Sequence, residues 1–427
     1  MLDIKFIREN IDVVKENMKK KFQEVSSVDE LLEIDSKVRK LMVEIQNLRQ
    51  SRNSLSQRIS EAKKQGKDSE VAKIMKEAKE VPDKILNLEK ILSELKEKQN
   101  KILIKVPNIM HDSVPIGKDD SENVEIRKWG EPRKFDFPVK NHVELLEELG
   151  LADFETSAKT SGNGFYFLKG DLGLLNQALI HFVIDFMRLK EYTYIEPPLM
   201  LHKEVLDAAM DTESFKDTIY SVSGEDLHLI GTSEHALLGI HTNEAIPENE
   251  LPKKYFSYSM CFRKEIGSHG INEKGLWRTH QFNKVEQFIF CKPEDSYRYY
   301  DELLQNSEEI FQQLGLPYRV IECCSGDLAA WKAKSCDMEV WRPTTQAYGE
   351  VTSLTNCTDF QARGLSIRVV YNDGSRAILH TLNNTATATS RALVAIVENY
   401  QQKDGSILVP EVLRKYMGKD VITGEKK

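Results

Sequence analysis

The sequence predicts an α+β protein in which a long antiparallel coiled-coil hairpin precedes a domain of strands and helices. Hydrophobic residues recur at heptad spacing over about 28–104, interrupted once by a short Gly-containing break at 65–68. Further along, residues 255–265 and 278–291 form two strand patterns joined by a polar loop that contains three glycines. A chain of 427 residues is long enough to form more than one domain.

Composition limits the possible classes of function. The formal net charge is −8, so contact with a nucleic acid would need a local basic surface. The N-terminus lacks an apolar run with a cleavage site, and we see no apolar stretch of about 18 residues, so we expect a cytoplasmic protein without a membrane segment. The six cysteines form no C-x-x-C pair, so we expect reduced thiols and no zinc. A zinc site with Cys and carboxylate ligands remains an alternative.

The sequence predicts three helices in the N-terminal region. Residues 1–25 suggest one short amphipathic helix, and two heptad helices of about 36 residues, each roughly 55 Å long, should follow it. Pro82 should kink the second of these or open its hydrogen bonding locally. The expected seam positions are Leu31, Ile34, Val38, Leu41, Ile45, Leu48, Arg52, Leu55, Ile59 and Ala62, then Val71, Ile74, Ala78, Val81, Ile85, Leu88, Leu92, Leu95, Gln99 and Ile102.

The outer faces of this hairpin stay free because its seam is buried against itself. Basic residues are frequent toward the tip, and we expect them to have no partner in the seam and to contact phosphates. These residues are Arg49, Arg58, Lys63, Lys64 and Lys67. A solvated coiled coil, or one that contacts a second subunit, is the alternative.

The two strands at 255–291 carry an unusual set of charges. Side chains alternate between the faces of a strand, so Arg278, His280, Phe282, Lys284 and Glu286 should share one face. On the partner strand Arg263 and Glu265 should share one face. Buried charges are costly unless they are paired or bind a ligand. The face is therefore either solvated, with cross-strand ion pairs, or the floor of a site for a ligand with phosphate, a flat ring and an ammonium group.

These residues also carry a family resemblance. The pattern Phe-Arg-x-Glu at 262–265, followed by Arg-x-His-Gln-Phe-x-Lys-x-Glu at 278–286, resembles motif 2 of class II aminoacyl-tRNA synthetases in its seryl form. Residues 381–391, TLNNTATATSR, resemble motif 3, with the usual glycines replaced as in the seryl branch. A helix at 177–190 followed by Pro197-Pro198 resembles motif 1, which forms the dimer interface in the family. The sequence contains neither a P-loop nor a Rossmann glycine motif after a strand.

The resemblance covers essentially the whole chain and implies its organisation. Residues 1–107 would form a tRNA-binding domain, and residues 108–427 a class II catalytic domain with an antiparallel sheet of six to eight strands flanked by helices. The implied activity joins L-serine to ATP as seryl-adenylate and transfers the seryl group to the 3′ end of serine tRNA, and also of selenocysteine tRNA. The implied assembly is a homodimer with tRNA bound across subunits. A paralogue that loads a carrier protein and a non-catalytic RNA-binding relative are the rivals.

The resemblance also implies residue roles. Catalysis would depend on Arg263, Glu265, Arg278 and Arg391. ATP would contact these four and also Lys264, Thr279, Phe282, Glu350, Val351, Thr352 and Ser353. Serine would contact Thr232, Ser233, Glu234, Arg263, Glu286, Asn383 and Thr385. Glu350 and Ser353 would hold the Mg²⁺ that accompanies ATP, and their odd spacing requires a bend or bulge between them.

Overall fold

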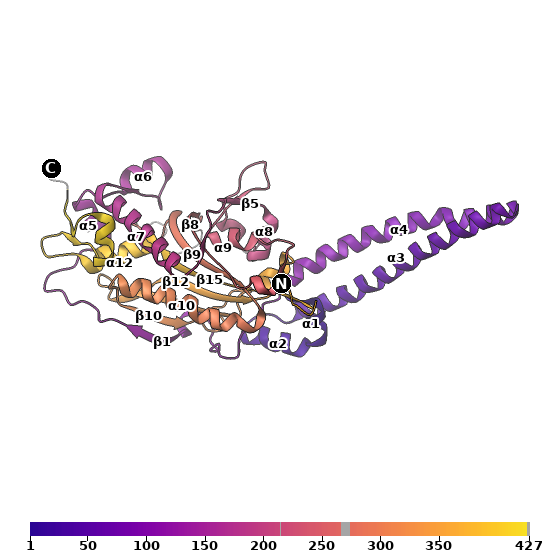
Figure 1. Ribbon diagram of the computed structural model, residues 1–427, viewed down its shortest axis with the longest axis horizontal. Coiled ribbons are helices and arrows are strands. Elements are labelled where there is room, and N and C mark those ends of the chain that lie inside the picture. Colours follow the sequence, from indigo (N-terminus) through magenta and orange to yellow (C-terminus); the bar gives the residue numbers. More distant parts are fainter. Residues whose placement is uncertain (214, 266–273, 425–427) are drawn as a thin grey trace. The chain divides into compact units, whose positions relative to one another are not determined.

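The computed structural model describes residues 1–213, 215–265 and 274–424 (Figure 1). It divides into two compact units, Leu2–Pro107 and Asn108–Lys427, the latter together with Met1. Each unit is described by itself below. The loop predicted between the two motif 2 strands lies mostly outside the described residues.

The N-terminal unit consists of helices, two of them long. These helices are α1 (Ile4–Glu9), α2 (Ile11–Lys20), α3 (Ser26–Lys64) and α4 (Asp68–Leu103). The single helix expected in residues 1–25 is wrong, because Asn10 leaves the helical conformation (φ −133°) and separates α1 from α2. The α3–α4 hairpin is confirmed, and α4 is assigned as one helix that includes Pro82.

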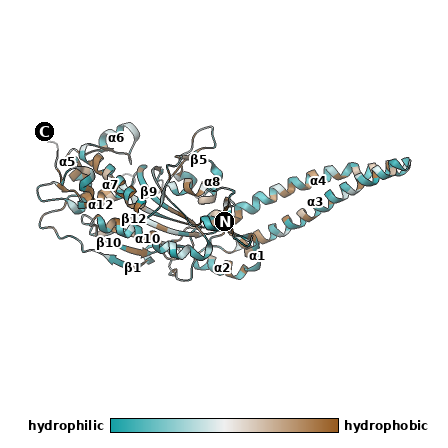
Figure 2. Cartoon of the chain, viewed as in Figure 1, coloured by the Kyte–Doolittle hydropathy of each residue, from teal (hydrophilic) through white to brown (hydrophobic). Residues whose placement is uncertain are grey.

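The seam between α3 and α4 follows the heptads. Along both helices, apolar residues are interspersed with hydrophilic ones, as Figure 2 shows by colour. Ile45, Leu55, Ile74, Val81 and Ile85 form one buried cluster, whereas Arg52 is exposed. Burial of such a stripe supplies most of the stability of a helix of this kind.

One polar position also belongs to this unit. The buried carboxylate of Asp35 accepts a hydrogen bond from Arg39 Nε at 2.9 Å and another from Gln99 Nε2 at 3.2 Å. Arg8 Nε of α1 lies 3.4 Å from the same carboxylate. Gln99 is thus a seam residue that bonds a buried charge, which explains its place in an otherwise apolar series.

The second unit is built on a sheet of eight strands in the order β1-β10-β11-β12-β15-β9-β8-β4. All neighbours are antiparallel except β4 and β8, which are parallel, so the predicted α+β fold and sheet size are confirmed. The strands are β1 (Val124–Trp129), β4 (Thr193–Tyr194), β8 (Lys253–Phe262), β9 (Gln281–Cys291), β10 (Tyr318–Glu322), β11 (Lys334–Arg342), β12 (Ala347–Thr358) and β15 (His380–Ala388).

Helices and small sheets surround this large sheet. The helices are α5 (His142–Glu148), α6 (Phe154–Ser161), α7 (Gly170–Leu189), α8 (Lys203–Ala209), α9 (Ser233–Gly239), α10 (Ser296–Gln313), α11 (Phe360–Gly364), α12 (Thr389–Tyr400) and α13 (Glu411–Met417). The remaining strands are β2 (Ala152–Asp153), β3 (Phe167–Leu168), β5 (Met200–Leu201), β6 (His228–Leu229), β7 (Ala245–Pro247), β13 (Arg368–Val370), β14 (Arg376–Ile378), β16 (Ile407–Leu408) and β17 (Val421–Ile422).

Helix α10 covers one face of the sheet and leaves the other for a site. Gln287 of β9 and Asn384 of β15 both donate to Ser307 of α10, at 3.0 and 2.8 Å. Because strand side chains alternate, the flanking residues of β9 and β15 point to the opposite face.

The strand ends differ from the prediction. Strand β8 ends at Phe262 and β9 begins at Gln281, so the strand character expected at 263–265 and 278–280 is wrong. Glu265 has a φ of +50°, which no extended strand allows. His280 therefore leaves the expected face, and its Nδ1 lies 2.9 Å from the carbonyl oxygen of Arg263.

Helix α7 contradicts the expectation that the chain has no apolar stretch of about 18 residues. Within the described part of the chain it is the helix that is long and apolar enough to cross a membrane, although we expected no such stretch. Its residues Leu172, Leu175, Leu179, Val183 and Met187 are fully buried in the core of the unit. The apolar character of α7 is thus explained by packing inside the fold.

Candidate active site

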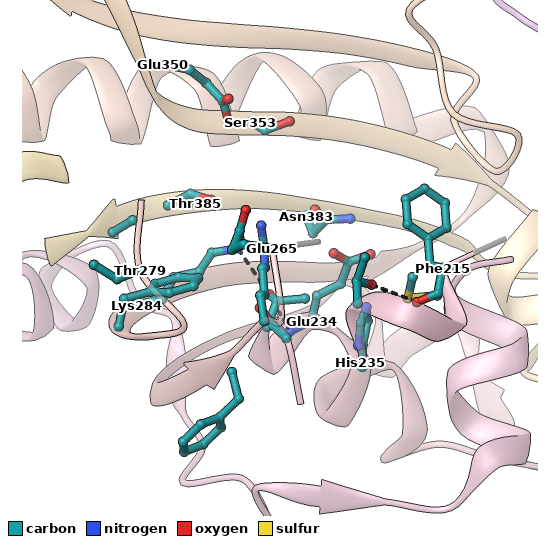
Figure 3. A pocket seen from close by; sticks show the side chains of 18 of the residues that line it. Phe215, Glu234, His235, Glu265, Thr279, Lys284, Glu350, Ser353, Asn383 and Thr385 are labelled. Carbon is teal, nitrogen blue, oxygen red and sulfur yellow. Dashed lines mark hydrogen bonds between the residues drawn. The ribbon is translucent and has the colours of Figure 1, made fainter. Parts of the chain in front are cut away.

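The face of the sheet opposite α10 borders a cavity of about 520 Å³, and most of the predicted site residues line this cavity (Figure 3). Strands β8, β9, β12 and β15 and the starts of α9 and α12 supply its walls. The predicted residues that line it are Thr232, Glu234, Arg263, Glu265, Arg278, Thr279, Phe282, Glu350, Val351, Ser353, Asn383, Thr385 and Arg391. Among the described residues, Ser233, Lys264, Glu286 and Thr352 were also predicted but do not line it.

Thr232 and Glu234 lie at the start of α9. Thr232 is the N-cap, and its Oγ1 accepts from the backbone N–H of Glu234 at 3.3 Å. The same Oγ1 accepts from Lys284 Nζ at 3.1 Å. Gln361 Nε2 donates to the Glu234 carboxylate at 2.8 Å, which fixes its direction. The helix cap therefore places a hydroxyl and a carboxylate at one end of the cavity.

Glu286 is fully buried behind Lys284, whose Nζ lies 2.5 Å from Glu286 Oε2. Thr385 Oγ1 is 3.5 Å from the same oxygen, and Glu286 Oε1 has no hydrogen-bond partner among the described residues. Burial raises the pKa of Glu286 to about 7, although Lys284 opposes this shift. The ammonium group of Lys284 thus already pairs with the Glu286 carboxylate, which we expected to contact serine.

Sequence reasoning left Lys284 out of the site residues although it belonged to the charged face of β9. His235, Trp277, Trp331 and Lys332 also line the cavity and were likewise left out, although none of them belongs to β9. For Lys284 the signal was the strand alternation that also selected Phe282 and Glu286. For His235, whose pKa burial lowers to about 4, the only signal was its place beside Glu234.

Three guanidinium groups from separate segments reach the cavity. Arg263 Nε donates to the carbonyl of Gly231 at 3.1 Å, and its guanidinium lies 5.3 Å from the centre of the Phe282 ring. Arg278 Nη1 pairs with Glu265 Oε2 at 2.8 Å. Arg391 Nη1 lies 3.1 Å from Glu350 Oε2. Three cations in one cavity favour a polyanionic ligand, because arginine is well suited to phosphate oxygens.

Arg391 also contacts Trp277. Its guanidinium lies 5.4 Å from the centre of the indole ring, and its Nε donates to the Trp277 carbonyl at 3.3 Å. Arg391 and Phe282 were both expected to contact ATP. In this structure each makes a cation–π contact with a different partner, Arg391 with Trp277 and Phe282 with Arg263.

The bulge required between Glu350 and Ser353 is present. Strand β12 pairs with β11 as Thr352 with Met338 and then Glu350 with Glu339, so Val351 is the extra residue. Glu350 and Ser353 consequently both line the cavity and both come from β12 (Figure 3). In a regular strand, residues three positions apart point to opposite faces, so without the bulge only one of the two could face the cavity.

Oxygen groups and one ammonium group lie around this bulge, since Lys332 Nζ donates to Ser353 Oγ at 3.4 Å. Asp337 is the strand partner of Ser353, and its Oδ1 has no hydrogen-bond partner within the described ranges. Burial and the neighbouring Glu350 carboxylate raise the pKa of Asp337 to about 7. Among the residues described here, no group of three or more His, Cys, Asp or Glu side chains forms a metal cluster. The donors nevertheless fit a hard cation that takes most of its ligands from phosphate and water.

The basic residues of the hairpin are described within their own unit. Arg58, Lys63, Lys64 and Lys67 are exposed. Arg49 Nη2 of α3 forms an ion pair with Glu89 Oε1 of α4 at 2.6 Å. Lys67 Nζ lies 4.0 Å from Glu70 Oε2 of α4. The expectation that these cations have no partner across the seam is therefore wrong for Arg49, because α3 and α4 face each other there.

Comparison with known proteins agrees with this geometry. Residues 1–110 match the model of the seryl-tRNA synthetase N-terminal domain, and residues 217–400 match that of the tRNA synthetase class II core domain (G, H, P, S and T). A serine–tRNA ligase of Methanocella arvoryzae is 47% identical over 98% of this chain and 99% of the relative. The chain belongs to the seryl-tRNA synthetase family. A serine–tRNA ligase of Thermodesulfovibrio yellowstonii is 44% identical over 99% of this chain and 100% of the relative.

Solved structures of the family superpose over the full chain. Seryl-tRNA synthetase from Pyrococcus horikoshii, solved with ATP, shares 42% identity and a TM-score of 0.91, with 100% of both chains covered. The cytoplasmic serine–tRNA ligase of Naegleria fowleri, solved with AMP, shares 34% identity and a TM-score of 0.86. That match covers 100% of this chain and 99% of the other.

Proposed function

We propose that the cavity activates L-serine with ATP and that the protein transfers the seryl group to tRNA. The observation that carries this proposal is the joint presence of Arg263, Arg278 and Arg391 with a cluster of smaller polar groups in one cavity. The arginines suit a triphosphate, and the polar groups suit a small amino acid with a hydroxyl. Those groups are Thr232, Glu234, Asn383 and Thr385.

In the first step a carboxylate oxygen of serine forms a bond to the α-phosphorus of ATP. The bond between that phosphorus and the bridging oxygen breaks, and pyrophosphate leaves. Arg263 holds the α-phosphate and the serine carboxylate, while Arg278 and Arg391 hold the outer phosphates. The Phe282 ring supports the adenine, and the backbone of Thr279 contacts its edge. No side chain acts as a nucleophile, so the rate enhancement comes from positioning and charge stabilisation.

Serine is recognised through its ammonium and hydroxyl groups. Glu286 and Glu234 provide carboxylates for the ammonium, and Lys284 gives up its contact with Glu286 when serine binds. Thr232, Asn383 and Thr385 pair with the hydroxyl. Asn383 Nδ2 supports this assignment, because it is buried and has no hydrogen-bond partner in the described part of the chain.

Glu350 and Ser353 would hold Mg²⁺ together with ATP. The ion supplies positive charge that offsets charge on the phosphate oxygens during transfer. Glu350 suits this task because its carboxylate stays ionised: burial would raise its pKa, but Arg391 outweighs that effect and the pKa is lowered.

In the second step a hydroxyl of the 3′-terminal ribose of tRNA attacks the carbonyl carbon of seryl-adenylate, and AMP leaves. The exposed cations near the tip of the α3–α4 hairpin hold the RNA backbone. We expect a cytoplasmic homodimer with tRNA bound across its subunits. Serine tRNA is the main acceptor, and selenocysteine tRNA is expected as a second one.

Serine-dependent exchange of pyrophosphate into ATP tests the activation step, and charging of serine tRNA tests transfer. A non-catalytic RNA-binding protein would show no exchange, and a carrier-loading enzyme would exchange but leave tRNA uncharged. Alanine offers a comparison substrate, since it lacks the hydroxyl that the polar groups would pair. A site built for a hydroxyl should activate alanine at least about 10⁴-fold less efficiently. Alanine activated within about tenfold of serine would contradict the assigned hydroxyl contacts.

A further inference from the structure

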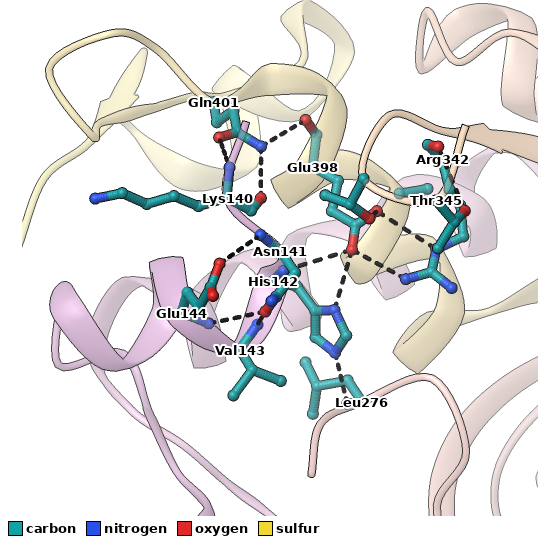
Figure 4. A network of polar contacts seen from close by, with 12 residues as sticks. Lys140, Asn141, His142, Val143, Glu144, Leu276, Arg342, Thr345, Glu398 and Gln401 are labelled. Atoms are coloured by element: carbon teal, nitrogen blue, oxygen red, sulfur yellow. Dashed lines mark hydrogen bonds and ion pairs between the residues drawn. The ribbon is translucent and has the colours of Figure 1, made fainter. Parts of the chain in front are cut away.

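A buried polar network lies beside the cavity and uses residues to which the proposed mechanism gives no role (Figure 4). His142 begins α5 and Glu398 belongs to α12, and their side chains are 8% and 0% exposed. His142 Nδ1 lies 3.1 Å from Glu398 Oε1. Arg342 Nη2 and Thr344 Oγ1 also donate to the Glu398 carboxylate, at 3.1 and 2.8 Å. Burial would raise the pKa of Glu398, but bonds from His142 and Arg342 outweigh it and lower the pKa.

The other ring nitrogen of His142 holds the backbone that leads into β9. The N–H of Leu276 donates to His142 Nε2 at 3.1 Å. Nε2 must therefore be unprotonated, and Nδ1 must carry the proton that it donates to Glu398. Gly275 packs against the same ring, since a Cβ at Gly275 would lie 2.4 Å from His142 Nε2. The imidazole thus fixes the backbone of 275–276 by a hydrogen bond and by close contact.

This segment is connected to an arginine of the cavity. The Trp277 carbonyl accepts from Arg391 Nε at 3.3 Å. The Trp277 ring also has two guanidinium neighbours, Arg342 at 4.2 Å and Arg391 at 5.4 Å from its centre. Arg391 and Glu398 are seven residues apart on α12, two turns along one face. One helix therefore carries both the cavity arginine and the carboxylate that orients His142.

We propose that His142 is a positioning residue for ATP: as a neutral imidazole oriented by Glu398, it fixes the 275–277 backbone and thereby the direction of Arg391. The inference rests on the proposed function for the identity of the ligand. It assigns a role in nucleotide binding to a residue outside the cavity lining. Serine, which is placed at the Thr232 end of the cavity, should be affected little.

Three substitutions of His142 separate its two hydrogen bonds. His142→Ala removes both, and His142→Gln can place an amide oxygen near the Nε2 position to accept from Leu276. His142→Asn places its amide near Nδ1 and can bond Glu398 but not Leu276. Calorimetric binding of ATP without serine, and KM for each substrate in pyrophosphate exchange, are the measurements. His111→Ala is the matched control, because that ring contacts Ser113 and Tyr297 instead.

For His142→Ala we expect ATP affinity to fall about tenfold, since a buried N–H loses its acceptor. KM for serine should change by less than about twofold. His142→Gln should recover most of the ATP affinity, and His142→Asn should not. Equal behaviour of the Gln and Asn variants, equal loss for both substrates, or an unchanged ATP affinity would overturn the inference. If His142→Ala fails to fold, the comparison of Gln with Asn decides.

Gly275→Ala approaches the same contact from the other side. It should lower ATP affinity and should not add its effect to that of His142→Ala, because both displace one contact. Gly374→Ala is its control, since Gly374 also has a positive φ (+83°) but open space around its Cβ position. Additive effects would contradict the inference. Failure of the proposed function would instead appear as absent serine-dependent exchange in the unmodified protein, while ATP binding would still test His142.

Discussion

At the scale of single residues, three of the cations that line the cavity pair with carboxylates of the protein itself. Lys284 pairs with Glu286, Arg278 with Glu265, and Arg391 with Glu350. A ligand would therefore displace a partner that is already in place: the serine ammonium would replace Lys284 at Glu286, and Lys284 would keep its bond to Thr232. Such preformed pairs keep the charged groups in place before the substrates arrive, which is the arrangement that electrostatic catalysis requires.

The first residue prediction concerns the charge of Glu286. Glu286→Gln keeps the shape but removes a charge-assisted bond to the serine ammonium, so serine binding should weaken by roughly 1.5–3 kcal/mol. ATP binding should change little. Binding of each ligand by calorimetry measures both effects. Glu308→Gln, at a buried carboxylate that pairs with Arg127, is the control. An equal loss for serine and ATP would mean that Glu286 has a structural role only.

The second residue prediction concerns pH. The pKa of Glu286 is raised to about 7 by burial, so the group gains its proton as the pH falls through that value. Only the ionised form attracts an ammonium, and KM for serine should therefore rise about tenfold between pH 8 and pH 6. The profile in Glu286→Gln should be nearly flat. A profile in the unmodified protein that is flat over this range would show that Glu286 does not bind the ammonium.

At the scale of elements, the hairpin was predictable and the strand ends were not. Heptad spacing depends on burial within two neighbouring helices, and the burial of Leu31, Val38 and Ile45 follows it directly. The ends of β8 and β9 depend on backbone geometry at Glu265 and on the bond between His280 and Arg263. Those are tertiary features, and an alternating pattern cannot reveal them.

The residues of the site can likewise be divided into those that the sequence predicts and those that it does not. Motif spacing identified Arg263, Arg278 and Arg391, because each is tied to a recognisable pattern. The contact of Lys284 with Glu286 was not predicted. Strand alternation places both side chains on one face of β9, but it does not tell which of them lines the cavity and which lies behind it. The polar network around His142 joins α5, α12 and the segment before β9, which are far apart in the sequence.

The element prediction concerns the seam of the hairpin. Ile74 is 3% exposed and its neighbour Met75 is 52% exposed on the same helix. Ile74→Ala should destabilise the hairpin by about 2–5 kcal/mol through lost burial and a cavity. Met75→Ala, the matched control, should cost less than about 0.5 kcal/mol. Hydrogen exchange of α3 and α4 amides measures the difference. Similar protection in both variants would contradict the seam assigned to Ile74.

At the scale of the whole molecule, two units each contain their own buried core. The hairpin buries Ile45, Leu55, Ile74, Val81 and Ile85, while the large core surrounds the eight-stranded sheet. Every residue that lines the cavity belongs to the Asn108–Lys427 unit, within the described ranges. The cavity and the hairpin therefore share no residues. A deletion of the hairpin can test whether the two also function independently.

The whole-molecule prediction is that deletion of residues 28–102, with the ends joined by a short linker, separates the two reactions. Serine-dependent pyrophosphate exchange should survive, since the cavity and its supporting core remain. Charging of tRNA should collapse, because phosphate contacts dominate affinity for RNA. Parallel assays of exchange and charging measure this. If the shortened protein charges tRNA as well as the intact one, the hairpin does not bind RNA.

A milder version of this test neutralises Arg58, Lys63 and Lys64. Arg49 is left unchanged because it pairs with Glu89. Loss of three phosphate contacts should reduce the slope of log affinity against log salt by about 2–3. Lys98→Gln with Lys101→Gln is the control, since these lysines pair with Glu30 and Glu97 in the same unit. Equal slopes in both variants would contradict an RNA contact at the tip.

The seam of the hairpin also restricts how the chain can gain or lose residues. An insertion in α3 rotates every later side chain about the helix axis, and a step of seven residues returns the apolar series to the seam without changing the supercoil. The same step must then occur in α4, or the two helices no longer meet side by side along their length. Each paired step moves the tip by about 10 Å. The reach of the hairpin therefore changes most easily in increments of one heptad, whereas surface loops tolerate insertions of many lengths.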